Sequence, residues 1–312
     1  MTAIIGGLGA AVLWAAATLC SSRSSRMLGS RLVLAWVMIV GVLVGLPIAL
    51  VSPGPATIEP STFALLGLAG ICYSAGLQLT YAALKIGKVS IVAPIVATEG
   101  AVAALIAVAL GDHIGLLAAM MLAVIVAGVV LSTLEPGRTD VPAGDFDLVA
   151  DAIDGPAPTN SDPSTPTATG ERPIDTRRAV LFAVGSALIF GVGLVASGKS
   201  ASLVPVAWVA LAARLVGMVV VVLPLALQGR IYLTRAALPL VLIAGVGEVI
   251  GSMLSVWGSR ESIAIAAVMG SQFAAVASVA AYFLFRERLG RVQLAGVVLI
   301  VAGVTVLAAA TA

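Results

Sequence analysis

The chain has 312 residues, of which 60% are hydrophobic and only 10% are charged. Soluble domains carry about 25% charged residues, so this composition excludes a soluble protein and predicts an integral membrane protein. The net charge of +2 comes from basic residues spread over short loops, and this pattern argues against nucleic-acid binding.

Ten continuous apolar runs are long enough to cross a bilayer as helices, which takes about 20 residues each. The expected spans are 3–20, 32–51, 62–84, 89–110, 114–134, 179–196, 203–227, 236–258, 262–285 and 292–311. The first run lacks the basic start and the cleavage site of a signal peptide, so we expect it to be a membrane span. We therefore predict an all-α integral membrane fold of ten transmembrane helices.

One polar segment, 135–178, interrupts the series of spans. It holds nine acidic and four basic residues, is rich in Pro, Asp, Thr and Ser, and has few large apolar residues. Such a segment buries too little surface to offset its ordering entropy, so we predict a disordered acidic linker. The linker separates a first five-helix repeat, 1–134, from a second, 179–312.

The two halves match one another at an offset near 175 residues. Gly111–Gly115 falls on Arg286–Gly290, and Ala127-Gly128-Val129 falls on Ala302-Gly303-Val304. Because each half has an odd number of spans, the second half must enter the membrane inverted. Inverted repeats are typical of secondary transporters, whose substrate site lies near the midplane between the repeats.

Loop charges agree with inverted repeats. The loops after odd-numbered spans hold fourteen Lys or Arg residues, whereas those after even-numbered spans hold two. By the positive-inside rule the linker is cytoplasmic and both termini face outward.

Several motifs resemble the repeat of the drug/metabolite transporter superfamily, of the EamA type. They are Tyr81-Ala82-Ala83-Leu84-Lys85, then Leu110-Gly111-Asp112, and in the second half Phe285-Arg286-Glu287-Arg288-Leu289. Asp112 stands where the family usually has Glu, and the Tyr-Ala-Leu pattern is weak in the second half. The resemblance implies a ten-helix transporter of unspecified cargo. It also implies cytoplasmic termini, opposite to the charge count.

Three ionisable residues lie near the centres of expected spans: Glu99, Arg214 and Glu248. Such groups are costly in a bilayer and usually face protein or water. Arg214 is always charged and needs an acceptor, for which we favour the Glu248 carboxylate. Glu99 is then the candidate site for a proton or a cationic substrate. The alternative is a purely structural pair with the other glutamate in a water-filled vestibule.

Further polar or aromatic residues of the spans are candidates for the same cavity. Thr98 and Gln272 fall at similar depth in the overlay of the two halves, and Pro94 is expected to kink its span. The remaining candidates are Trp14, Tyr73, Gln78 and Tyr81. No catalytic motif, metal-ligand spacing or cofactor-binding motif occurs, so we predict no enzyme activity, no metal and no cofactor.

We therefore predict a secondary transporter, an exporter of a small metabolite, amino acid or drug, in a bacterial cytoplasmic membrane. It would work by alternating access, with or without coupling to protons. The alternative functions are a flippase, or flippase subunit, for a lipid-linked intermediate and, less favoured, a polytopic membrane enzyme. The sequence indicates no oligomeric state.

Overall fold

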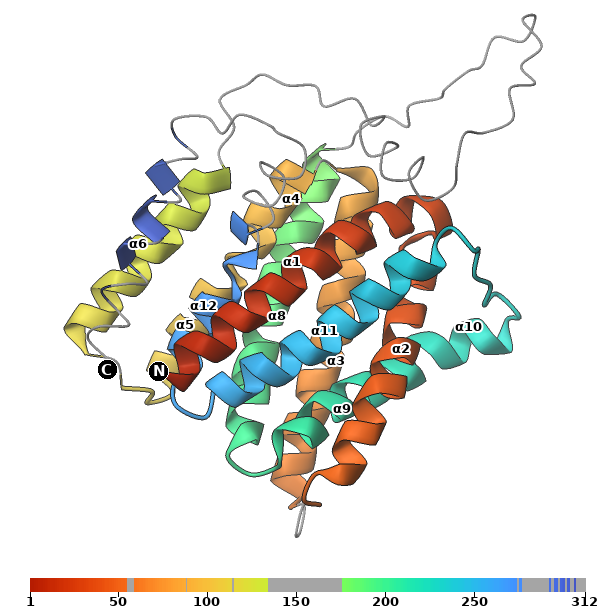
Figure 1. Ribbon diagram of the computed structural model, residues 1–312, viewed down its shortest axis with the longest axis horizontal. Helices are drawn as coiled ribbons and strands as arrows, with labels where there is room; N and C mark the ends of the chain where they lie inside the picture. The colour runs from red at the N-terminus through yellow and green to blue at the C-terminus, as the bar shows by residue number, and fades with distance from the viewer. Residues whose placement is uncertain are drawn as a thin grey trace, which may run out of the picture.

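The computed structural model describes residues 1–54, 59–87, 89–113, 115–133, 176–273 and 275–276, with a few positions between 292 and 306. Every regular element in these residues is helical (Figure 1). The helices are α1 (Thr2–Leu28), α2 (Ser30–Val51), α3 (Pro60–Ile86), α4 (Val89–Val96), α5 (Glu99–Ala109), α6 (Leu116–Thr133), α8 (Thr176–Ala201), α9 (Val206–Gly217), the π-helical turn η1 (Met218–Val222), α10 (Leu223–Leu227), α11 (Leu238–Gly258) and α12 (Ile263–Gly270).

Six helices of the described residues are long and apolar enough to cross a membrane. They are α1, α2, α3, α8, the continuous run from α9 through η1 to α10, and α11. Each corresponds to an expected span. The linker 135–178 lies outside the described residues apart from 176–178. So do residues 277–285 of the ninth expected span, 262–285, and more than half of the tenth, 292–311.

The fourth expected span, 89–110, consists of two helices, with the interruption after Pro94 rather than at it. α4 ends at Val96, a turn follows at Ala97-Thr98, and α5 begins at Glu99. α4 continues through Pro94, and at the turn the Thr98 amide donates to the Ile95 carbonyl at 3.2 Å, three residues back, instead of four. The Thr98 hydroxyl also donates to the carbonyl of Ile95 at 2.7 Å.

A matching break ends α12. Ser271 has φ −67° and ψ −5°, close to the −69° and −7° of Thr98. Its hydroxyl donates to the carbonyl of Val268 at 2.8 Å, again three residues back. The two breaks touch, since a Cβ on Gly100 would lie 2.6 Å from both the Ser271 hydroxyl and the Ala267 carbonyl oxygen. Equivalent helices of the two repeats therefore cross where each is interrupted.

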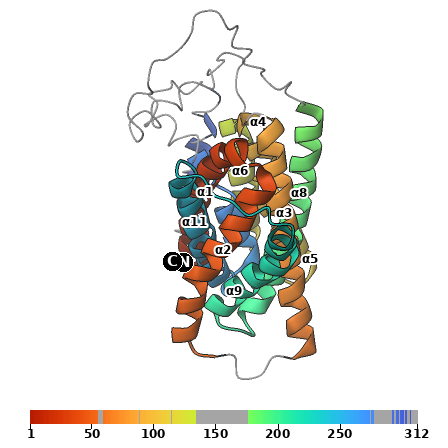
Figure 2. The ribbon, with the colours of Figure 1, turned by 90° about the vertical axis from the view of Figure 1, so that its right-hand side faces the viewer.

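The long helices of one repeat pack on those of the other. α1 runs antiparallel to α11, because Gly6 lies against Leu254 while Leu13 lies against Gly247. α3 runs antiparallel to α8, with Cys72 against Gly193 and Leu79 near Gly185. Figure 1 shows α1 and α11 side by side across the molecule, and Figure 2 shows α3 beside α8.

These two helix pairs are equivalent. An offset of 175 residues carries α1 onto α8 and α3 onto α11. The contact between α1 and α11 is therefore the symmetry equivalent of the contact between α8 and α3. Inverted repeats related by a two-fold axis in the membrane plane are expected to produce such a repeated contact. Small residues on α11 let α1 approach closely, since a Cβ on Gly247 would lie 2.8 Å from the Leu13 carbonyl oxygen of α1.

Two loop carboxylates join the repeats at one end of the molecule. Asp112, between α5 and α6, accepts hydrogen bonds from the Ala264 amide at 3.1 Å and the Ser262 hydroxyl at 3.3 Å, at the start of α12. Glu261 accepts from the Ala3 amide at 2.9 Å, at the start of α1. Each therefore supplies acceptors for the free amides of a first helical turn in the other repeat.

Candidate transport site

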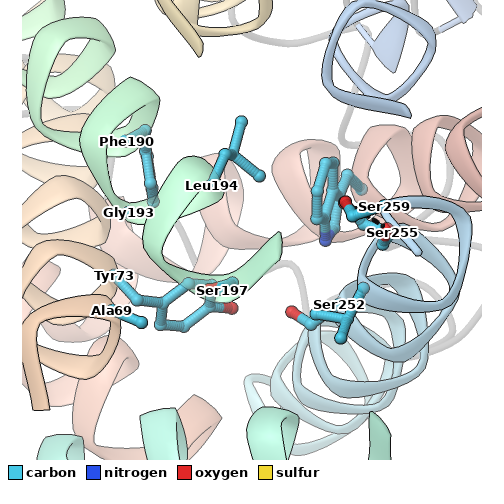
Figure 3. Close-up of a pocket in the computed structure, with 11 residues that line it drawn as sticks. Ala69, Tyr73, Phe190, Gly193, Leu194, Ser197, Ser252, Ser255 and Ser259 are labelled. Atoms are coloured by element: carbon cyan, nitrogen blue, oxygen red, sulfur yellow. Dashed lines mark hydrogen bonds between the residues drawn. The ribbon is translucent and has the colours of Figure 1, made fainter. Parts of the chain in front are cut away.

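A small cavity of about 40 Å³ lies between α1, α3, α8 and α11. Tyr73 faces it from the α3 side, Ser197 from α8 and Ser252 from α11 (Figure 3). Trp14 of α1 also lines it. Ligand sites of about 300–1,000 Å³ are usual for drug-sized molecules, so this conformation has room only for water.

Arg214 lies beside the cavity and is fully buried, with 0% of its surface exposed. It comes from α9, and its approach depends on Gly41 of α2, where a Cβ would lie 2.7 Å from the Arg214 Cδ. Its Nη2 donates to the Glu248 carbonyl oxygen at 2.7 Å and to the Ser252 hydroxyl at 2.8 Å. In the part of the chain that the structure describes, its Nε and Nη1 have no hydrogen-bond partner.

Tyr73 contacts two charged groups, the Arg214 guanidinium and the Glu248 carboxylate. The Arg214 guanidinium carbon lies 3.9 Å from the centre of the Tyr73 ring, a cation–π contact. The Tyr73 hydroxyl donates to Oε2 of Glu248. Phe190 of α8 packs against the ring edge with centroids 6.1 Å apart. Tyr73 therefore contacts the guanidinium through its ring and the carboxylate through its hydroxyl.

The Glu248 carboxylate is not the direct partner of Arg214, which corrects that hypothesis. No ion pair within 4.0 Å joins the two side chains, both of which the structure describes. The contact goes through the Glu248 backbone carbonyl instead, because the carboxylate points to the Tyr73 hydroxyl and Ser252 stands on the next turn of α11. The two charges still interact electrostatically across this short separation.

Glu99 is buried, with 5% of its surface exposed, at the first position of α5. Within the described residues its carboxyl group has no hydrogen bond and no ion pair. It is close enough to Glu248 for the two carboxylates to interact. A buried carboxylate without a partner is costly, so this group favours a proton or a cation.

The other candidates divide into two groups. Thr98 lies next to Glu99, and Gln272 lies just after α12. Among the described residues, nothing hydrogen-bonds to the buried Oε1 of Gln272 or to the buried Nε1 of Trp14. Gln78, by contrast, lies away from the cavity and donates to the Ser30 hydroxyl at 3.3 Å. Tyr81 is buried and accepts a hydrogen bond from the Ser21 hydroxyl at 3.1 Å.

Sequence reasoning missed part of the cavity wall. Ser197 and Phe190 of α8 line it, but a serine and a phenylalanine in an apolar helix carry no signal of their own. The overlay of the two repeats does provide a signal. Because α8 packs antiparallel on α3 as α1 packs on α11, α8 is expected to line the cavity as α1 does.

Within the described residues, no group of three or more His, Cys, Asp or Glu is arranged to hold a metal ion.

The molecule is thus a multi-pass membrane protein made of two repeats that exchange helices, with buried ionisable and polar groups where they meet. This arrangement defines the class of secondary transporters. The chain belongs to the EamA-like transporter family, whose model matches residues 1–134 and 177–309. The expected resemblance is confirmed. Family membership identifies a non-enzymatic secondary transporter of a small molecule.

The fold recurs among solved structures. One, described as "Crystal structure of protein", superposes with a TM-score of 0.73 at 18% sequence identity, covering 99% of this chain and 98% of that chain. At this identity the likeness establishes the fold alone. No curated protein matches the chain.

Proposed function

We propose that this transporter exports a small polar metabolite from the bacterial cytoplasm and couples its movement to protons at Glu99. The observation that carries the proposal is the buried Glu99 carboxyl group without a partner, close to a second carboxylate. Two carboxylates and one guanidinium in a dry interior leave one negative charge uncompensated. Uptake of one proton by Glu99 balances the cluster.

The substrate is proposed to bind between Tyr73, Arg214 and Gln272. Supporting this, Arg214 Nε and Nη1, Gln272 Oε1 and Trp14 Nε1 are buried without partners, although most buried polar groups in proteins are paired. A polar substrate entering an enlarged cavity would satisfy them. The cavity must then expand in another conformation, as alternating access requires.

The helix breaks supply a place for that movement. Thr98 and Ser271 each interrupt a helix beside the crossing at Gly100. Backbone turns within crossing helices absorb rotation more readily than continuous helices, because fewer hydrogen bonds must break. A rotation of one repeat against the other at this crossing would open one end of the cavity and close the other.

The test is transport by the purified full-length protein in liposomes. Vesicles loaded with a pH-sensitive dye receive a panel of amino acids, other metabolites and cationic drugs under an imposed pH gradient. The proposal predicts that at least one dissolved solute moves and that its movement carries protons. Empty vesicles are the control for leakage. The Arg214→Gln variant tests the proposed site and should transport the solute at least tenfold more slowly than the parent protein.

Lipid flipping is measured in the same vesicles with a fluorescent lipid and an external quencher. Movement of the lipid with no movement of any dissolved solute would contradict the proposal and favour the flippase function. If a solute moves without protons at any pH, the protein is still a transporter, but the proposed role of Glu99 in proton coupling is contradicted.

A further inference from the structure

We infer that a second, peripheral site binds the phosphate of an anionic phospholipid headgroup. The site is a groove of about 590 Å³, separate from the central cavity, where the start of α2, the end of α3 and the loop after α10 meet. Its lining residues are Leu28, Gly29, Ser30, Arg31, Leu32, Lys85, Leu225, Gly229, Arg230 and Tyr232. We call these residues the basic groove.

Three cations define the chemistry of the basic groove. Arg31 lies in the first turn of α2, Lys85 in the last turn of α3 and Arg230 in the loop after α10, and all three are exposed. Within the described residues, none of their side chains has a hydrogen bond or an ion pair, and no lining residue is acidic. Three cations that repel one another without a counter-charge create a local preference for an anion.

The start of α2 adds donors to the same groove. Gly29 has φ +91°, and its carbonyl accepts the Val33 amide at 3.2 Å as the first bond of the helix. No side chain caps this end of α2. The amides of its first turn therefore remain free beside Arg31, and such amides favour a phosphate oxygen.

The surroundings favour a lipid over a dissolved phosphate. All three cations lie on the side that the charge distribution assigns to the cytoplasm, at or beside the ends of membrane-spanning helices. Beside the groove, η1 and α10 present exposed apolar side chains, with Val219 63% and Leu227 80% exposed. These side chains offer a surface for acyl chains directly below a bound headgroup. Tyr232, 56% exposed, has the position of an interfacial aromatic residue.

Native mass spectrometry of the full-length protein in detergent tests the inference. Phosphatidylglycerol is titrated against phosphatidylcholine, with soluble glycerol phosphate as the dissolved source of the same group. We expect one saturable phosphatidylglycerol site, with each of Arg31→Gln, Lys85→Gln and Arg230→Gln weakening binding about fivefold. The charge-conserving Arg31→Lys should bind almost as the parent protein does.

The matched control is Arg235→Gln, an exposed cation of the same loop as Arg230 that does not line the groove. It should leave the affinity unchanged. If Arg235→Gln and Arg230→Gln lose the same affinity for phosphatidylglycerol, the binding is a general attraction of basic loops to anionic lipid. That result would overturn the proposed site. Equal binding of phosphatidylcholine would also overturn it. If glycerol phosphate binds more tightly than the lipid, the groove is a site for a dissolved ligand, and the assignment to a lipid headgroup is overturned.

Discussion

Tyr73 and Glu248 occupy equivalent positions of the two repeats, 175 residues apart, and the Tyr73 hydroxyl donates a hydrogen bond to the Glu248 carboxylate. Residues that are equivalent in sequence can meet only near the axis that relates the repeats. The Arg214 guanidinium stacks on the same Tyr73 ring. The charged cluster is therefore built where the two repeats must move against each other, and its contacts are sensitive to their relative position.

Removing the Tyr73 hydroxyl should destabilise the protein because it leaves a buried carboxylate oxygen without its donor. We expect Tyr73→Phe to cost about 1–3 kcal/mol, and Tyr73→Leu to cost more because it also removes the cation–π contact. Thermal unfolding in detergent measures both. Tyr81→Phe, which loses only a bond between two neutral hydroxyls, is the control and should have the smallest effect. An equal loss in Tyr81→Phe and Tyr73→Phe would contradict this account.

The crossing of the broken helices should tolerate no added side chain at Gly100. A Cβ there would lie 2.6 Å from the Ala267 carbonyl oxygen and from the Ser271 hydroxyl, so the helices must separate. We expect Gly100→Ala to lower stability by about 1–3 kcal/mol and to slow transport. Gly67→Ala is the matched control in α3, because a Cβ at Gly67 meets nothing within 4 Å. Unchanged melting and transport in Gly100→Ala would show that the crossing is not closely packed.

Hydropathy was sufficient to predict most of the fold. Apolar runs predicted the six long helices, and the 175-residue offset predicted which helices are equivalent. The position of the break at Ala97-Thr98 was not predicted, because Pro94 marks a weakened helix but the chain continues as α4 to Val96 before it turns. The direct acceptor of Arg214 was also missed, since hydropathy does not show which atom of Glu248 faces a neighbouring helix.

Glu248 should matter through its charge more than through a direct bond to Arg214. Glu248→Gln keeps the carbonyl that Arg214 contacts and an oxygen that can accept from Tyr73, but it leaves the guanidinium uncompensated. We expect a loss of about 3–5 kcal/mol, measured by thermal unfolding. The double variant Arg214→Met with Glu248→Gln should recover part of this loss, because the Arg214 charge is removed together with the Glu248 charge that compensates it. A double variant no more stable than Glu248→Gln would argue against charge compensation.

Glu261 should make the contact between α1 and the α11–α12 turn sensitive to acid. The N-terminal ammonium group at 2.7 Å and the hydrogen bonds from Thr2 and Ala3 lower the pKa of Glu261 to about 2 from its usual 4.5. A carboxylate with a lowered pKa stabilises the folded state fully above its usual pKa, and this contribution disappears as the pH falls towards 2.

Glu261→Gln should therefore lower the melting temperature at pH 7 and reduce its fall below about pH 4.5. Melting is recorded from pH 8 to pH 3, with Glu59→Gln as a control at an exposed carboxylate. The same acid dependence in the parent protein and in Glu261→Gln would show that the contact contributes nothing.

The role of Glu99 as the proton-coupling group is tested most directly by the pH dependence of transport in Glu99→Gln. Glutamine keeps the size and polarity of the side chain, but it cannot bind and release a proton. Transport of a solute found in the liposome panel is measured from pH 5.5 to pH 8 in the parent protein, in Glu99→Gln and in Thr98→Ser as a neighbouring control. The account predicts that Glu99→Gln stays folded and loses proton-coupled transport, while Thr98→Ser keeps it. A Glu99→Gln protein that transports with an unchanged pH profile would contradict the account.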